Sequence, residues 1–215
     1  MTGEQIKQFL HATIEGTGQR WFIPDKNYYL RPTEKVAQDI IGCLLVVVNK
    51  DKVCGGKIVE AEAYLGETDP ACHAARGITP ITEIFYKEGG VAYVFHAYGV
   101  WHCFNVIVCP AGIAGCVLVR ALEPMFGIDE MVKRRNTTPD KLRNLCSGPG
   151  KLCQALGIET RHSGFDLRKS DLLILAPDSK SIDIVTGPRI GINKARDWQL
   201  RYCVKDSLWL SRKGG

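Results

Sequence analysis

The sequence predicts an α+β fold rich in β-structure: a curved, mostly antiparallel sheet flanked by short helices, with one protruding β-hairpin. Three observations support this fold class. Short runs of Val, Ile and Leu recur between turn signals, and helical spacing is confined to brief segments. One long β-rich stretch, 91–108, bends only near Gly99. A length of 215 residues suits one domain, and no repeat or linker interrupts it, so we predict a single domain over 1–215.

The helices are expected where apolar residues recur every three or four positions, and glycines after several of these segments mark their ends. The expected helices are 2–14, 33–41, 129–136, a segment that begins at 138, and 152–156. The strands are expected in apolar or β-branched runs between turns. The expected strands are 44–48, 57–64, 91–97, 100–108, 116–122, 172–175, 182–185, 189–192 and 200–204, with the first two paired antiparallel through a turn at 49–52.

The nine cysteines are odd in number, form no CxxC pair and mostly lie inside apolar runs. This pattern indicates buried thiols in a reducing compartment rather than a disulfide framework. The spacing also argues against zinc, so no metal and no cofactor are expected. No secretory signal or membrane-length apolar run is visible, so we expect an intracellular protein without a membrane partner.

The formal charge is unevenly distributed along the chain. Residues 1–130 carry a net charge of −4, whereas residues 131–215 carry +9. A basic second half beside an acidic first half suits a polyanionic partner held against carboxylates, although solvated surfaces often show the same asymmetry.

Residues 57–66 contain the most informative pattern. Side chains alternate along a strand, so Glu60, Glu62 and Tyr64 share one face. Val59 and the two alanines that follow share the other face, which must enter the core. Two interpretations of the acidic face remain open. Both glutamates are ordinary solvated groups, or one is a general base or cation stabiliser beside an aromatic ring.

Arg120 interrupts the apolar run 116–122. It is expected either to pair with a charged group, because an unpaired buried arginine is costly, or to reach water from an edge strand. The long segment after Gly66 is expected to be a functional loop, and the bend at Tyr98 places that ring near an exposed hairpin tip.

Five segments together resemble the alkyladenine (3-methyladenine) DNA glycosylase family, in order over most of the chain from about residue 28. They are Glu-Ala-Tyr-Leu-Gly at 62–66 with His73, Tyr-Gly at 98–99 with Cys-x-Asn at 103–105, Val-Leu-x-Arg-Ala-Leu-Glu-Pro at 117–124, Gly-Pro-x-Lys-Leu-Cys-x-Ala-Leu at 148–156, and Pro-Arg-Ile-Gly-Ile at 188–192. The resemblance implies a base-excision-repair enzyme that flips alkylated or deaminated purine nucleotides out of double-stranded DNA and hydrolyses the N-glycosidic bond.

The resemblance also implies a catalytic pair. Glu62 matches the carboxylate that activates the attacking water and stabilises the oxocarbenium-like sugar. Arg120 and the backbone carbonyl of Ile190 match groups that hold this water. No lysine occupies the matched positions of the catalytic strand, so a monofunctional enzyme without a lyase step is expected. The resemblance also implies a monomer, located in the cytoplasm beside the nucleoid in a bacterium or in the nucleus of a eukaryote. Glu60 is expected to be structural.

The remaining matches concern the base and the duplex. Tyr64 and Phe95 match aromatic walls that favour a cationic alkylpurine, and His73 completes the pocket. Asn105 matches the residue that excludes guanine by crowding its 2-amino group. Tyr98 matches the wedge, the side chain that enters from the minor groove and fills the gap that the flipped nucleotide leaves in the base stack.

The sequence departs from the family at two places. Residues 81–85 replace a proline and an Arg-Asn pair, which puts local pocket support or a DNA contact in question. His96 stands where an aliphatic residue is common, either as a packed core histidine or as a change in pocket polarity.

Two other classes of function remain open. One is a non-catalytic module that binds damaged DNA on the same scaffold. The other is a carbohydrate glycosidase that uses Glu60 and Glu62, although the usual pair of carboxylates flanks the scissile bond. Binding that weakens steeply as the salt concentration rises would favour DNA over carbohydrate as the ligand.

Overall fold

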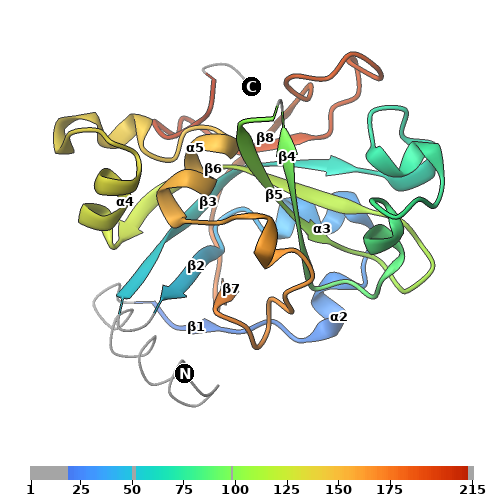
Figure 1. Ribbon diagram of the computed structural model, residues 1–215, viewed down its shortest axis with the longest axis horizontal. Helices are drawn as coiled ribbons and strands as arrows, with labels where there is room; N and C mark the ends of the chain where they lie inside the picture. The colour runs from blue at the N-terminus through green and yellow to red at the C-terminus, as the bar shows by residue number, and fades with distance from the viewer. Residues whose placement is uncertain (1–18, 50–51, 98, 213–215) are drawn as a thin grey trace.

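A computed structural model describes residues 19–49, 52–97 and 99–212. Its nine strands form one sheet in which every pairing is antiparallel, in the order β1-β7-β2-β3-β6-β5-β4, with β9 pairing both β3 and β8 (Figure 1). The predicted fold class is confirmed. The strands are β1 Trp21–Phe22, β2 Leu44–Asn49, β3 Lys52–Tyr64, β4 Val91–Ala97, β5 Trp101–Ile107, β6 Cys116–Phe126, β7 Leu172–Pro177, β8 Ile184–Gly187 and β9 Arg201–Val204.

Strand β3 is the axis of the sheet. One of its edges pairs with β6 from Gly55 to Tyr64. The other edge pairs with β2 over its first half and with β9 at Glu60–Glu62. The second half of β3 is therefore central, and both of its faces are covered. This arrangement explains why β3 is buried along nearly its whole length.

A β-bulge interrupts the pairing of β3 with β6 around Glu60, where the register shifts twice. Bulges re-aim side chains and are common beside active sites. The bulge corrects one prediction: Ile58 joins Ala61 and Ala63 in the main core cluster, whereas Val59 is buried outside that cluster. The strict alternation expected from the sequence fails at this position because the strand contains one extra residue.

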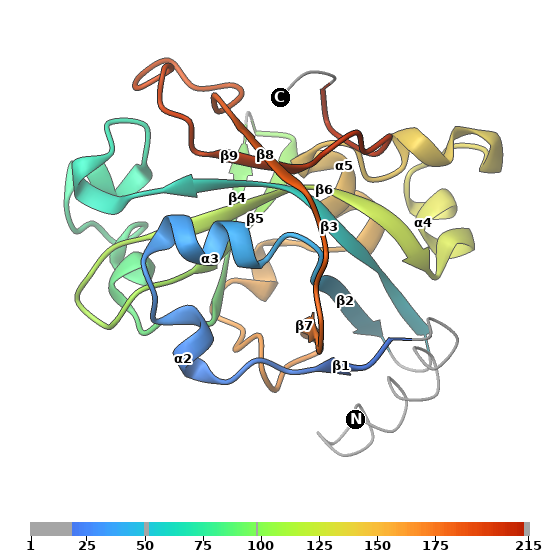
Figure 2. The same ribbon diagram turned by 180° about the vertical axis from the view of Figure 1, so that it is seen from behind.

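Helices cover both faces of the sheet. Figures 1 and 2 show α4 (Ile128–Arg134) and α5 (Pro149–Leu156) on one side, with α2 (Lys26–Tyr29) and α3 (Thr33–Asp39) on the other. Helix α5 begins with a proline, whose missing N–H costs nothing in the first turn. It ends at Gly157, whose φ of 73° suits the left-handed cap that closes a helix. The apolar faces of α3 and α5 contribute to the same core cluster as β3 and β6.

The long segment between β3 and β4 is ordered by three short 3₁₀ turns rather than by longer helices or strands. These turns are η2 Gly66–Thr68, η3 His73–Arg76 and η4 Glu83–Tyr86, and two further turns, η5 Pro139–Asn144 and η6 Thr160–His162, flank α5. Gly66 has a φ of +72°, and a Cβ there would lie 2.1 Å from the carbonyl oxygen of Ala114. Only glycine permits this close turn out of β3.

Several predicted boundaries change. The expected strand at 189–192 is not a strand, because its peptide groups bond to side chains of the site instead of to a neighbouring strand. The expected strand at 182–185 lies at Ile184–Gly187, and the expected helix from 138 is the 3₁₀ turn η5. Strand β1 and helix α2 were not expected. The helix expected at 2–14 lies outside the described residues.

All nine cysteines are buried and free, as the sequence predicts. Within the part of the chain that the structure describes, no helix has both the length and the apolar character needed to cross a bilayer.

Candidate active site

Three adjacent strands direct charged side chains into one buried cluster. Glu60 and Glu62 come from β3, Arg120 from β6 and Arg201 from β9. Glu62 and Arg201 are directly opposed in the β3–β9 register, so their side chains share a face. Both glutamates have 0 % of their surface exposed. The interpretation of Glu60 and Glu62 as ordinary solvated groups is therefore wrong.

Glu62 is held by three donors. Its Oε1 accepts the backbone N–H of Ile190 at 2.7 Å. Its Oε2 accepts the Tyr64 hydroxyl at 2.9 Å and Arg120 Nη1 at 3.3 Å. A second, longer contact of 3.5 Å runs from Arg120 Nη1 to the carbonyl of Ile190. The structure thus brings Glu62, Arg120, Ile190 and Tyr64 into one contact network.

Burial and neighbouring charged groups set the pKa values of Glu62 and Arg120. Burial raises the pKa of Glu62, and Arg120, the Ile190 N–H and the Tyr64 hydroxyl offset only part of that rise. Burial works to lower the pKa of Arg120, but the two carboxylates outweigh it, and the net shift is upward. Arg120 therefore stays a guanidinium, and its side chain is only 9 % exposed. The alternative in which it reaches water from an edge strand is wrong.

A second buried ion pair fixes the ring of Tyr64. Arg189 bonds Asp69, and its guanidinium carbon lies 4.6 Å from the centre of the Tyr64 ring. Arg189 also donates to the carbonyl of Ala63 at 2.9 Å. Asp69 accepts the N–H of Leu65 as well, which anchors the turn that leaves β3. Burial works to raise the pKa of Asp69, but Arg189 and the backbone donors hold it below its ordinary value.

An aromatic cluster lies beside this turn. His73 contacts Phe95 edge to face with ring centres 4.6 Å apart, and Phe95 stacks on Tyr93 at 5.4 Å. The Nδ1 of His73 bonds the Tyr93 hydroxyl at 3.0 Å. Burial, helped by the charge of Arg76, lowers the pKa of His73 and favours the neutral ring. Tyr64 and Phe95 both pack against the buried apolar cluster that contains Tyr93.

The altered segment 81–85 supports this cluster. Thr82 is buried, accepts the N–H of Thr79 at 2.7 Å and donates to the carbonyl of Gly77 at 2.7 Å. Phe85 is 1 % exposed and lies edge to face with Tyr93 at 4.9 Å. Local support is therefore present in this loop, from a hydroxyl network and a buried ring.

Asn105 is buried on β5, opposite Tyr93 on β4. Its side-chain amide donates to the carbonyl of Tyr93 at 3.2 Å. This bond fixes the amide next to the aromatic cluster. The proposed role of Asn105 toward guanine stays a prediction.

His96 is not a packed core histidine. It is exposed on β4 and faces its strand partner His102, with ring centres 4.2 Å apart. The position falls near the hairpin tip, where the strand has left the core. Tyr98, the predicted wedge at that tip, lies outside the described residues.

The sequence interpretation missed several residues of the site. They are Asp69, Tyr93, Arg189, Arg201 and Ser211, all of which contact a predicted site residue or its support. A signal existed for Tyr93, which shares a strand face with Phe95, and for Arg189, which precedes Ile190 in a family-like motif. No local signal marks the other three, because their partners are far away in the chain.

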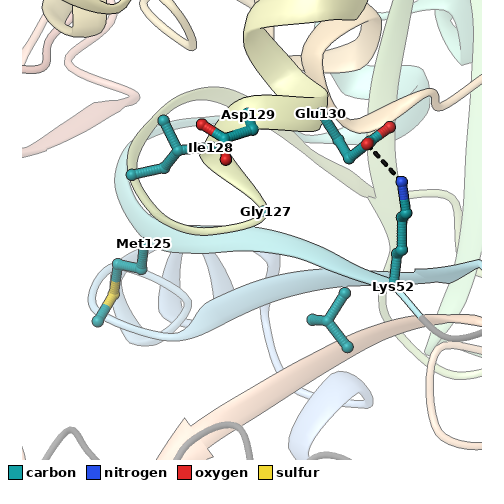
Figure 3. Close-up of a pocket in the computed structure, with 7 residues that line it drawn as sticks. Lys52, Met125, Gly127, Ile128, Asp129 and Glu130 are labelled. Carbon is teal, nitrogen blue, oxygen red and sulfur yellow. Dashed lines mark hydrogen bonds and ion pairs between the residues drawn. The ribbon is translucent and has the colours of Figure 1, made fainter.

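A shallow recess elsewhere on the surface is not part of this site. Figure 3 shows it at the start of β3 and of α4, with the Lys52–Glu130 ion pair on one side and Met125 on the other. Ten residues of β3 separate Lys52 from Glu62, about 33 Å of extended strand. Among the described residues, no group of three or more His, Cys, Asp or Glu side chains is placed to hold a metal ion.

Comparisons with known proteins show the family of this chain. The family model described as methylpurine-DNA glycosylase matches residues 27–208. A protein of Rhodopseudomonas palustris is 44 % identical over 202 residues, covering 94 % of this chain and 91 % of that protein. Relatives in Francisella tularensis strain SCHU S4 (42 %, covering 84 % and 94 %) and Methanoculleus marisnigri (43 %, covering 86 % and 97 %) are similar. All three are named "Putative 3-methyladenine DNA glycosylase". The chain therefore belongs to the methylpurine-DNA glycosylase family, whose enzymes hydrolyse N-glycosyl bonds.

Proposed function

We propose that this protein removes alkylated or deaminated purines from double-stranded DNA by hydrolysis, with Glu62 as the general base. The target nucleotide is flipped out of the duplex, because the sugar carbon cannot otherwise reach a buried carboxylate. Membership of a family of DNA glycosylases supports the reaction class. The geometry around Glu62 supports the mechanism.

The observation that carries the proposal is the unequal occupancy of the two buried carboxylates. A carboxylate offers about four acceptor sites. Among the described residues three donors bind Glu62, one of them an arginine, and its Oε1 accepts a single bond and keeps a lone pair for a water molecule. Four donors bind Glu60, and two of them are arginines, so its charge is more fully compensated. Of the two, Glu62 is therefore suited to accept a proton from water.

The chemistry follows from this placement. The water oxygen bonds to the sugar carbon as the bond from that carbon to the purine nitrogen breaks, and the electron pair leaves with the base. Glu62 takes the water proton, and its charge stabilises the developing cationic sugar. A cationic alkylpurine leaves as a neutral base. A neutral deaminated purine leaves as an anion that takes a proton from solvent water, so the cationic purine is the easier leaving group.

The aromatic groups fit the recognition of such a base. Tyr64 and Phe95 offer ring faces for a cationic purine, and neutral His73 keeps its second ring nitrogen for the flipped nucleotide. As the family resemblance implies, we assign to Asn105 the exclusion of guanine. To Tyr98 we assign the filling of the gap that the flipped nucleotide leaves in the base stack. Among the residues that the structure describes, no lysine bonds Glu62, which fits a monofunctional enzyme.

The test is a single-turnover assay on duplexes that contain hypoxanthine, 3-methyladenine, 7-methylguanine or ethenoadenine. We expect the free base to be released and an abasic strand that breaks only after alkali. Borohydride should trap no covalent protein–DNA adduct. Binding of the damaged duplex without release of any base would favour the non-catalytic damage-binding module. Strand cleavage without alkali would contradict the monofunctional mechanism.

A further inference from the structure

Glu60 is a fully buried carboxylate that four donors bind among the described residues. Its Oε1 accepts from Arg120 Nε at 3.0 Å, Arg201 Nε at 2.8 Å and Ser211 Oγ at 2.7 Å. Its Oε2 accepts the backbone N–H of Ser211 at 2.6 Å. Glu60 is 0 % exposed and these protein groups surround it, so it is poorly placed to bind water or substrate itself. Any effect it has on the reaction must act through its neighbours.

The neighbour that matters is Arg120, because it touches both carboxylates. Its Nε binds Glu60 at 3.0 Å, and its Nη2 lies 3.5 Å from Ser211 Oγ. Its Nη1 reaches Glu62 at 3.3 Å. The contact with Glu60 is the shorter of the two. The guanidinium is therefore held along its Nε and Nη2 edges and presents a single nitrogen to Glu62.

An arginine without this restraint binds a carboxylate through two parallel N–H···O bonds. Such a pair would occupy the acceptor site on Glu62 that the proposed water needs. It would also place the full guanidinium charge on Glu62 and make that carboxylate a weaker base.

The restraint comes partly from the end of the chain. Ser211 follows β9 by seven residues and lies 151 positions from Glu60 in the sequence. Both its N–H and its hydroxyl bond Glu60. Figures 1 and 2 show the C-terminal segment lying along the same side of the sheet as β8 and β9.

We propose that Glu60, fixed by Ser211, is a positioning residue that keeps Arg120 from closing a two-point ion pair with Glu62. The inference rests on the proposed function, in which Glu62 is the base. It adds a second carboxylate and the C-terminal segment to the machinery of the same site.

The test compares wild type with Glu60→Gln, which keeps the shape of the side chain and removes its charge. Arg120 should then turn to Glu62, so the single-turnover rate of base release should fall on the order of 10- to 100-fold. The acid limb of the pH–rate profile should also move to lower pH. A ¹³C NMR titration of the Glu62 carboxyl, assigned with Glu62→Gln, should show the same downward move in duplex-free protein.

A matched control is Glu123→Gln, on β6, which removes a half-exposed carboxylate that pairs with Lys57. Its rate and its pH profile should equal those of wild type. Suppose that Glu60→Gln releases base more slowly, but that the pKa of Glu62 and the acid limb of the pH–rate profile equal those of wild type. Glu60 is then merely structural, and the proposal is overturned. If wild type releases no base, the proposed function fails, while the titration still decides the geometry.

The charge of Glu60 by itself raises the pKa of Glu62, so its loss alone moves the Glu62 titration downward. Ser211→Ala and Ser211→Thr keep that charge, so they separate the position of Arg120 from the loss of the charge, and they also serve should Glu60→Gln not fold. The alanine variant loses the hydroxyl between Glu60 and Arg120, and its rate should fall several-fold. The threonine variant keeps a hydroxyl and should restore the rate. Equal rates in wild type and both variants would overturn the proposal.

Discussion

At the scale of single residues, Glu60 and Glu62 share a strand and full burial but differ in their partners. Glu60 is bound by two arginines and by the C-terminal Ser211. Glu62 is bound by one arginine, a tyrosine hydroxyl and one peptide N–H. A buried carboxylate with fewer compensating donors is the better proton acceptor, because desolvation is less completely offset.

The pH dependence of the reaction should follow from Glu62. A general base acts only as the carboxylate, so the rate must rise with pH as Glu62 loses its proton. Burial raises the pKa of Glu62, so this rise should occur above the ordinary glutamate value of about 4.3. Single-turnover rates measured from acidic to neutral pH check this. A rate that stays constant down to the ordinary glutamate value would contradict the assignment.

At the scale of elements, the turn after β3 depends on the buried pair between Asp69 and Arg189. Both side chains have 0 % exposure, and they join residues 120 positions apart. The pair fixes Tyr64 and the segment that carries Ile190. A loop without long helices or strands can hold the catalytic residues in place in this way, because its few polar contacts are buried away from water.

Asp69→Asn should therefore destabilise the protein by about 3–5 kcal/mol at neutral pH, since it leaves Arg189 buried without its counter-charge. The pKa of Asp69 is lowered in the folded state, so the stabilisation is present above the unfolded value of about 3.9. It is lost as pH falls through the folded pKa. Urea unfolding at several pH values should show the difference between variant and wild type shrinking toward acidic pH.

The control for this prediction is Glu88→Gln, which breaks an exposed ion pair with Lys26. Exposed pairs contribute about 0–1 kcal/mol, so this variant should unfold close to wild type. Equal stability of Asp69→Asn and wild type at neutral pH would show that the buried pair does not support the fold.

How far the sequence predicts the site depends on how local each signal is. Alternation along β3 places Glu60, Glu62 and Tyr64 on one face, and the contacts of all three agree with that. The bulge is not visible in the sequence, because it arises from pairing with β6. The strand expected at 189–192 fails for a related reason, since its alternating apolar residues fit a ladder but the N–H of Ile190 bonds Glu62.

At the scale of the whole molecule, apolar periodicity predicts most strands because each is buried on at least one face. The order of the strands in the sheet does not follow from apolar periodicity. The pairing of β9 with β3 brings Arg201 to the site across some 140 residues, and no local pattern encodes such a contact. The segment that follows β9 brings Ser211 to Glu60, so the packing of this segment on the sheet completes the contacts of Glu60.

The most direct test of the whole account is base release by Glu62→Gln, measured under single-turnover conditions beside binding to a duplex with an abasic-site analogue. The variant keeps the size of the side chain and loses the proton acceptor. We expect base release to be abolished while binding to the analogue survives. Release of 3-methyladenine at a rate near that of wild type would contradict the claim that Glu62 activates the water.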